Sequence, residues 1–302
     1  MINIGLIGFG RYGKKYYRNI INDKDFRLIK ILRVSKKKLN NKFTNNSRIF
    51  FKNNKINLFI IASPTSSHFE YLQTILKKNK NIIVEKPLVA NLKQFIKIKK
   101  KLKSSKKIIF INHTDLYSNA YLKLKQNLNL VGKINYAKLV FGKVDNYNIK
   151  NITSKYKLPY FEWLPHPLAI INDLFKNTKF KIKVFERRQN INGSIIQNLK
   201  IKLKNNDLKI DILFSNNYKN RKRNIEIHGT VGKLIYKGYE REKIFLVNKN
   251  KKKHIKTDDV DPVKNILHNF KKNFKNLKIR DDKNLIFSST KNLFEISDKI
   301  RF

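Results

Sequence analysis

A glycine-rich turn near the start of the chain constrains its fold more than any other feature. An apolar run at residues 2–7 leads directly into glycines with the spacing G-x-G-x-x-G, and apolar side chains then follow at helical spacing. In such a strand–turn–helix unit the first glycine permits a tight turn, the second lets the backbone approach a pyrophosphate, and the third lets the helix pack on the strand. The start of the helix supplies amide donors and a partial positive charge for the phosphates. The sequence therefore predicts a dinucleotide site, with cofactor-binding residues Gly8, Phe9, Gly10, Arg11, Tyr12 and Gly13.

The first part of the chain alternates apolar runs with helical stretches. The predicted strands are 2–7, 27–34, 58–62, 81–84 and 107–111, and helices are predicted at 68–78 and 92–102. Strands that alternate with helices imply right-handed crossovers and a doubly wound parallel sheet. We therefore expect an α/β chain in which residues 1–118 form a Rossmann dinucleotide-binding domain.

The pattern changes after about residue 118. A helix at 120–126 precedes a strand at 133–144, and further strands are predicted at 195–203, 208–214, 224–228, 233–236 and 243–247. Helices at 263–274 and 284–300 are expected to cover one face of this sheet, and 249–253 is expected to be a solvated loop. Residues 119–302 therefore read as an α+β domain with a mainly antiparallel open sheet. Its open face offers a surface for a homodimer or homotetramer.

The net charge of +47 comes from 68 basic residues, of which 56 are lysines. They are spread through nearly every predicted element, and the scarcity of glycine, proline and alanine beside abundant Lys, Asn and Ile is typical of an AT-biased genome. Proteins that read base edges or phosphates favour arginine forks. We therefore expect no specific nucleic-acid partner, and nonspecific nucleic-acid binding is a distant alternative.

The sequence also bears on location and on metal chemistry. No run approaches the 18 uncharged apolar residues of a membrane span, and the start lacks the basic region of a signal peptide. We therefore predict a cytoplasmic protein without a membrane partner. The absence of cysteine excludes disulfides and thiolate ligands, and no His and carboxylate cluster has metal-ligand spacing, so no metal is predicted.

The end of the second predicted strand bears on the choice of cofactor. An acidic residue there bonds the ribose 2′-hydroxyl of NAD, whereas a basic residue accepts the 2′-phosphate of NADP. This chain has no acid at the position and offers Arg33, Ser35 and Lys36 instead. The prediction is NADP in preference to NAD.

A second motif, Glu85-Lys86-Pro87, follows the fourth predicted strand. Together with the glycine turn it resembles the glucose-fructose oxidoreductase and inositol dehydrogenase (Gfo/Idh/MocA) family of NAD(P)-dependent sugar dehydrogenases. Residues 60–68 and the glycine-threonine turn at 227–232 are similar to further family segments, so the resemblance covers essentially the whole chain. It implies further cofactor-binding residues, which are Ser63, Pro64, His68, Glu85, Lys86 and Pro87.

The family's remaining motif is an aspartate followed, after three residues, by a histidine in the substrate-binding domain. This chain matches it at His166 and departs from it at Glu162. Pro165 and Pro167 fit only the first turn of a helix, so His166 is expected at a helix start, where the dipole favours the neutral imidazole. The resemblance implies catalytic roles for Lys86, His166 and Glu162, with Glu162 orienting the imidazole or binding a sugar hydroxyl.

The implied reaction is hydride transfer between nicotinamide and a carbinol or keto carbon of a sugar, cyclitol or nucleotide sugar. His166 exchanges the hydroxyl proton, and Lys86 bonds the reacting oxygen or the carboxamide of the cofactor. Because Glu162 departs from the family pattern, a dinucleotide-binding scaffold without turnover is the alternative. The predicted substrate-binding residues are Lys86, Asn112, His113 and His166.

Overall fold

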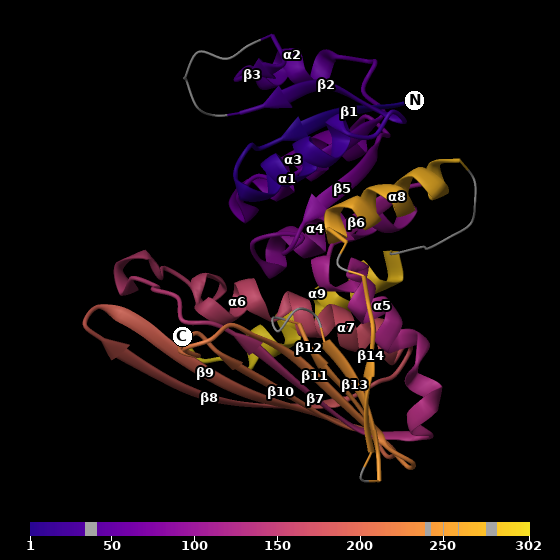
Figure 1. Ribbon diagram of the computed structural model, residues 1–302. Helices are drawn as coiled ribbons and strands as arrows, with labels where there is room; N and C mark the ends of the chain where they lie inside the picture. Colours follow the sequence, from indigo (N-terminus) through magenta and orange to yellow (C-terminus); the bar gives the residue numbers. More distant parts are fainter. Residues whose placement is uncertain (34–40, 239–242, 250, 259, 276–282) are drawn as a thin grey trace. The chain divides into compact units, whose positions relative to one another are not determined.

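The chain folds into two compact units, shown in Figure 1. The computed structural model describes residues 1–33, 41–238, 243–249, 251–258, 260–275 and 283–302. The first unit contains Met1–His113 and Pro262–Phe287, and the second contains Thr114–Asp261 and Ser288–Phe302. From the sequence we expected every residue after 118 to belong to the second domain. In the structure residues 262–287 belong to the first unit.

The first unit is built on a parallel sheet of six described strands with the order β3-β2-β1-β4-β5-β6. Their bounds are β1 (Ile2–Ile7), β2 (Phe26–Leu32), β3 (Phe43–Thr44), β4 (Leu58–Ile61), β5 (Asn81–Glu85) and β6 (Ile109–Asn112). This confirms the doubly wound sheet. The strand order reverses at β1, which pairs with both β2 and β4. The glycine turn after β1 therefore lies at the switch point where open α/β sheets bind their ligands.

The helices of this unit are α1 (Arg11–Ile21), α2 (Ser47–Lys52), α3 (Thr65–Lys77), α4 (Leu92–Ser104) and α8 (Pro262–Phe274). The placement of α8 corrects the expectation that it covers the second sheet, because α8 packs against α1 and β6 instead. The Phe270 ring of α8 meets the Phe110 ring of β6 edge-on, with centroids 6.1 Å apart. Lys271 also reaches Asp23 and Asp25 beyond the end of α1, at 3.1 and 2.8 Å.

The second unit contains a sheet whose eight described strands have the order β14-β13-β12-β11-β7-β10-β9-β8. Their bounds are β7 (Ile134–Gly142), β8 (Lys181–Ile191), β9 (Ser194–Lys204), β10 (Lys209–Ser215), β11 (Lys222–Gly229), β12 (Lys233–Lys237), β13 (Lys243–Asn248) and β14 (Lys251–Ile255). The pairing is mainly antiparallel, as predicted, and the β7–β10 pair is parallel. The charged stretch expected to be a loop instead supplies β14, an edge strand paired with β13. Lysine side chains are common on exposed edge strands.

Several helices lie against one face of this sheet, as Figure 1 shows. They begin with a short 3₁₀ helix η1 (Thr114–Tyr117) and α5 (Asn119–Gln126), continue with α6 (Pro159–Trp163) and α7 (Pro165–Leu174), and end with α9 (Lys283–Asp298). Further 3₁₀ turns are η2 (Leu128–Val131), η3 (Ile149–Asn151) and η4 (Lys155–Lys157). Helix α7 is buried along most of its length because it is apolar on nearly every side. Among the described residues, no helix has both the length and the apolar character to cross a membrane.

Candidate active site

The three glycines of the turn differ in whether the surrounding chain leaves room for a side chain. Gly8 has φ +91°, and a Cβ there would lie 2.5 Å from the Ala62 carbonyl oxygen. A Cβ at Gly13 would lie 2.3 Å from the Gly8 carbonyl oxygen. Gly10 differs, because its φ of −77° suits any residue and a Cβ there would meet no atom of the described chain within 4 Å. Packing therefore requires Gly8 and Gly13 and leaves a space open at Gly10.

That space lies at the N-terminus of α1. Among the described residues no side chain caps this end, and its first turn carries no acidic residue. Backbone N–H groups and the helix dipole favour an anion at such an end. The residues present therefore fit the pyrophosphate of a dinucleotide, which Gly8, Gly10 and Gly13 together with the start of α1 would hold.

The neighbouring cofactor residues have distinct environments. The Phe9 ring packs edge-on against Tyr17 and Phe43, with centroid distances of 5.5 and 5.0 Å, and so anchors the turn. Arg11 is exposed and Tyr12 half-buried in the first turn of α1. Arg33 follows β2, and its amide donates to the Thr44 carbonyl at 2.9 Å. The predicted phosphate contacts Ser35 and Lys36 lie outside the described residues.

His68 has a role that the sequence did not indicate. Its side chain is buried, and its two ring nitrogens lie 2.9 Å from the carbonyl oxygens of Ser63 and Pro87. Burial lowers the pKa of His68, and the two carbonyl contacts oppose this shift. The ring therefore ties the loop after β4 to the loop after β5. On the first of these loops Ser63 bonds Ser67 through their hydroxyls, and Pro64 precedes α3.

Lys86 stands at the end of β5, beside a buried carboxyl group. Its side chain is half-buried, and the Lys86–Pro87 peptide bond is cis. Burial raises the pKa of the neighbouring Glu85 to about 7, against hydrogen bonds from Asn112 and Tyr16 and the charge of Lys86. The Asn112 amide donates to Glu85 at 2.6 Å.

This arrangement changes the interpretation of two predicted residues. Asn112 was expected to bind substrate, but it is fully buried and bonds Glu85. Glu85 likewise directs its carboxyl group into the interior of the unit rather than to a cofactor. His113, the residue after β6, is also buried.

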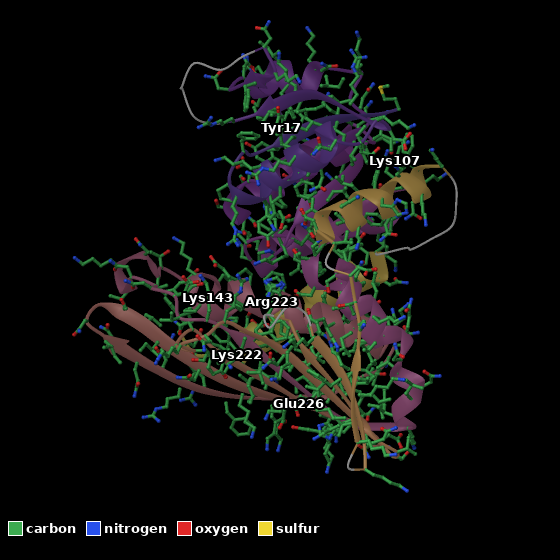
Figure 2. All side chains as sticks on the ribbon, in the orientation of Figure 1. Tyr17, Lys107, Lys143, Lys222, Arg223 and Glu226 are labelled. Atoms are coloured by element: carbon green, nitrogen blue, oxygen red, sulfur yellow. The ribbon has the colours of Figure 1, made fainter. Side chains whose placement is uncertain are left out.

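In the second unit His166 is part of a buried ionic cluster. It is the second residue of α7, directly after Pro165, as the prolines predicted. Its Nδ1 lies 2.5 Å from Oδ2 of Asp115 in η1. The other oxygen, Oδ1, accepts from Nη1 of Arg223 at 2.6 Å. Figure 2 labels Arg223 near the start of β11, with Glu226 farther along the strand.

The charges in this cluster determine the state of Asp115. Burial alone would raise the pKa of its carboxyl group, but the Arg223 guanidinium and the His166 imidazole outweigh burial and hold the pKa well below its usual range. Asp115 is therefore a carboxylate at neutral pH. The aromatic rings of Phe141 and Trp163 lie beside the imidazole, with centroids 6.4 and 6.2 Å away.

Glu162 was expected to orient the imidazole or to bind a sugar hydroxyl, and in the structure the Nδ1 contact of His166 is to Asp115. Glu162 is exposed on α6, where its carboxylate accepts from the Tyr147 hydroxyl at 3.1 Å. Glu162 lies on α6 and His166 on α7, so the two residues do not share one helix.

Sequence reasoning did not assign roles to Asp115 or Arg223. Asp115 lies shortly after the strand that ends at Asn112, and only the fold brings it to His166. Arg223 carried a usable signal, since it alternates with the buried Ile225 and Ile227 and therefore shares their inward face. A charged residue at such a position needs a buried partner. No group of three or more His, Asp or Glu residues in the described part of the chain could hold a metal ion.

Comparison with known proteins agrees with this architecture. Residues 2–113 match the GFO_IDH_MocA family, described as an oxidoreductase family with an NAD-binding Rossmann fold. Residues 2–113 are therefore similar to the NAD-binding domain of this family. An oxidoreductase from Formosa agariphila is 26% identical over 163 residues, which are 49% of this chain and 50% of that protein. The chain therefore matches only about half the length of this curated relative.

Solved structures share the fold over the whole chain. A protein from Magnetospirillum magnetotacticum has a TM-score of 0.83 at 17% identity, covering 99% of both chains. Biliverdin reductase from Synechocystis, solved with biliverdin and NADP⁺, has a TM-score of 0.80 at 15% identity, covering 99% of this chain and 98% of its own. UDP-N-acetylglucosamine 3-dehydrogenase from Acidithiobacillus ferrooxidans has a TM-score of 0.80 at 11% identity, covering 99% and 97%. At these identities the likeness shows the fold.

Proposed function

We propose that this protein is an NAD(P)-dependent oxidoreductase that interconverts a carbinol and a carbonyl carbon of a sugar, cyclitol or nucleotide sugar. The observation that carries the proposal is the bond from His166 to a buried, ionised Asp115, in a chain whose first unit is an NAD-binding Rossmann fold. A histidine held in this way is a suitable general acid or base. The UDP-sugar dehydrogenase of the same fold supports a sugar-type substrate.

The proposed chemistry divides between two residues. Bound nicotinamide supplies or accepts the hydride. His166 takes the hydroxyl proton when the substrate is oxidised and returns it when the carbonyl is reduced. Lys86 hydrogen-bonds the reacting oxygen, and its positive charge stabilises the developing alkoxide. Glu162, being exposed, binds a substrate hydroxyl rather than taking part in proton transfer.

The proposed cofactor is NADP in preference to NAD. Arg33 stands at the end of the second strand, where a basic side chain accepts a 2′-phosphate. The Synechocystis reductase of the same fold was solved with NADP⁺. The measurement is kcat/KM for both cofactors with wild type and Arg33→Ala. A higher value with NADPH that falls selectively in the variant is expected, and equal values in wild type would overturn the preference.

The main test of the function compares Lys86→Ala and His166→Ala with wild type across a sugar and nucleotide-sugar panel, followed by nicotinamide absorbance. We expect each variant to lose about 10²–10⁴-fold in turnover while cofactor affinity stays within a few fold. The matched controls are the exposed residues Lys101→Ala and His254→Ala, which should retain wild-type rates. Wild-type turnover in either site variant would refute its assigned role. Cofactor binding without turnover in the wild-type protein across the whole panel would favour the scaffold alternative.

A further inference from the structure

The bonding of Asp115 fixes which nitrogen of His166 carries a proton. An ionised carboxylate has no hydrogen to donate and only accepts. Its oxygen Oδ2 lies 2.5 Å from Nδ1 of His166, so the hydrogen in this contact belongs to Nδ1. A neutral imidazole carries a hydrogen on one nitrogen only, so its Nε2 holds a lone pair. The geometry therefore selects one of the two neutral forms of the ring.

Arg223 makes this selection stable. Its guanidinium donates to the second oxygen of Asp115 at 2.6 Å, and both residues are buried. Without such a cation, a buried carboxyl group would tend to take up a proton and could then donate to the imidazole. The arginine keeps Asp115 in the accepting form, and so acts on His166 through Asp115.

The surrounding elements hold these groups in place. Asp115, His166 and Arg223 come from η1, α7 and β11, so three separate elements meet at the cluster. In the sheet register Arg223 stands directly opposite Phe141 of β7. The Phe141 ring is nearly parallel to the imidazole, at an interplanar angle of 13°. Strand pairing thus aligns the guanidinium and the aromatic face with the same ring.

We propose that Asp115 and Arg223 are positioning residues that keep His166 in the Nδ1–H form, so that Nε2 is the atom that exchanges the proton with substrate. This rests on the proposed function. During oxidation the substrate O–H bond breaks and its proton passes to Nε2, while the C–H bond breaks and its electron pair leaves as hydride to the nicotinamide. The C=O double bond forms, and the resulting imidazolium keeps its Nδ1–H bond to Asp115. Reduction reverses each transfer.

The test observes the ring directly and requires no substrate. Long-range ¹H–¹⁵N NMR of the histidine rings distinguishes the two neutral forms, and His166→Gln identifies the signals by their loss. In the wild-type protein above the pH at which the ring is charged, we expect Nδ1 to carry the hydrogen. Observation of the Nε2–H form would overturn the inference, whatever the activity of the enzyme.

Two variants extend the test. In Asp115→Asn the amide can donate to Nδ1, so we expect the ring to shift to the Nε2–H form and turnover to fall by about 10²–10⁴-fold, in the range of general acid–base catalysis. Arg223→Lys keeps a cation and should retain the Nδ1–H form with turnover nearer to wild type. An unchanged Nδ1–H form in a folded Asp115→Asn would contradict the role of Asp115. If wild type shows the Nδ1–H form but no substrate turns over, the proposed function fails while the ring assignment stands.

Discussion

Each unit contains one buried carboxyl group next to a proposed catalytic residue, and the two groups differ in charge. Glu85, beside Lys86, is 6% exposed, and Asp115, beside His166, is 5% exposed. The donors bonded to Glu85 are neutral groups of Asn112, Tyr16 and the Lys86 backbone, the Lys86 charge also acts on it, and its pKa is raised to about 7. The direct partners of Asp115 are a guanidinium and an imidazole, and its pKa is lowered.

The comparison shows that the directly bonded partner, rather than burial, decides whether such a group is ionised. Burial opposes the charge on both carboxyl groups. Neutral donors and the more weakly coupled Lys86 charge offset only part of that penalty at Glu85, whereas the hydrogen-bonded guanidinium and imidazole exceed it at Asp115. Asp115 can therefore serve as a permanent anion behind His166, while Glu85 changes its protonation state near neutral pH.

The largest expected difference is in stability at pH 7. Asp115→Asn leaves the buried Arg223 guanidinium without its carboxylate, so the free energy of unfolding should fall by about 3–5 kcal/mol. Glu85→Gln keeps a neutral acceptor for Asn112 and cannot ionise, so it should not lower the free energy of unfolding at pH 7. Urea unfolding measures both. The control is Asp207→Asn, whose carboxylate is 67% exposed and pairs with Lys133. Equal losses in the two buried variants would break the comparison.

The next largest effect is the pH dependence that Glu85 gives to the free energy of unfolding. Its pKa is about 7 in the folded protein against an ordinary 4.5, so its contribution to stability is complete below pH 4.5 and is lost as the pH rises through 7. A shift of this size corresponds to about 3 kcal/mol. The pKa of Asp115 is lowered, so its contribution is present above its ordinary pKa of 3.8 and is lost only as the pH falls further.

Urea unfolding of wild type and Glu85→Gln between pH 4.5 and 8 measures this contribution. Subtraction of the two curves should isolate a fall in wild-type stability that begins near pH 4.5 and levels off above about pH 7, because groups common to both proteins cancel. Parallel curves for the two proteins would show that Glu85 has no raised pKa.

A smaller effect is expected from the neutral partner of Glu85. The Asn112 hydrogen bond lowers the pKa of Glu85, so its removal in Asn112→Ala should move that pKa further upward from about 7. A ¹³C NMR titration of the side-chain carboxyl group would follow the shift. A downward movement would mean that the amide does not stabilise the charged form.

The smallest expected effect is that of Glu162→Gln. This carboxylate is exposed and bonds Tyr147, so its neutralisation should leave kcat within a few fold and raise KM modestly if it binds a substrate hydroxyl. Steady-state kinetics of Glu162→Gln and Asp115→Asn, measured under the same conditions, give kcat and KM for the comparison. A loss of kcat as large as that of Asp115→Asn would restore the orienting role that the sequence assigned to Glu162.

Local patterns predicted most of the fold, whereas the roles of the individual site residues stay predictions. The glycine spacing, the apolar runs and the two prolines around His166 each depend on residues close together in the chain, and each element formed as expected. The pairing of His166 with Asp115 spans 51 positions, and that of Asp115 with Arg223 spans 108. Contacts between residues this far apart in the chain follow from the topology of the fold, which local patterns do not reveal. The only guide to a partner for His166 was the family pattern, and it indicated Glu162. The return of α8 to the first unit was missed for the same reason.

The central claim is that the first unit binds a nicotinamide dinucleotide at the glycine turn, and Gly10 offers its most direct test. The backbone at Gly10 suits any residue and an added Cβ meets no described atom within 4 Å, so Gly10→Val should fold with an unchanged melting temperature. The same side chain occupies the space proposed for the pyrophosphate. Calorimetric titration with NADPH and NADH should show binding to wild type and a loss of affinity of at least about tenfold in Gly10→Val, the cost of about 1.4 kcal/mol. Equal affinity in the two proteins, or no binding of either cofactor to wild type, would contradict the account.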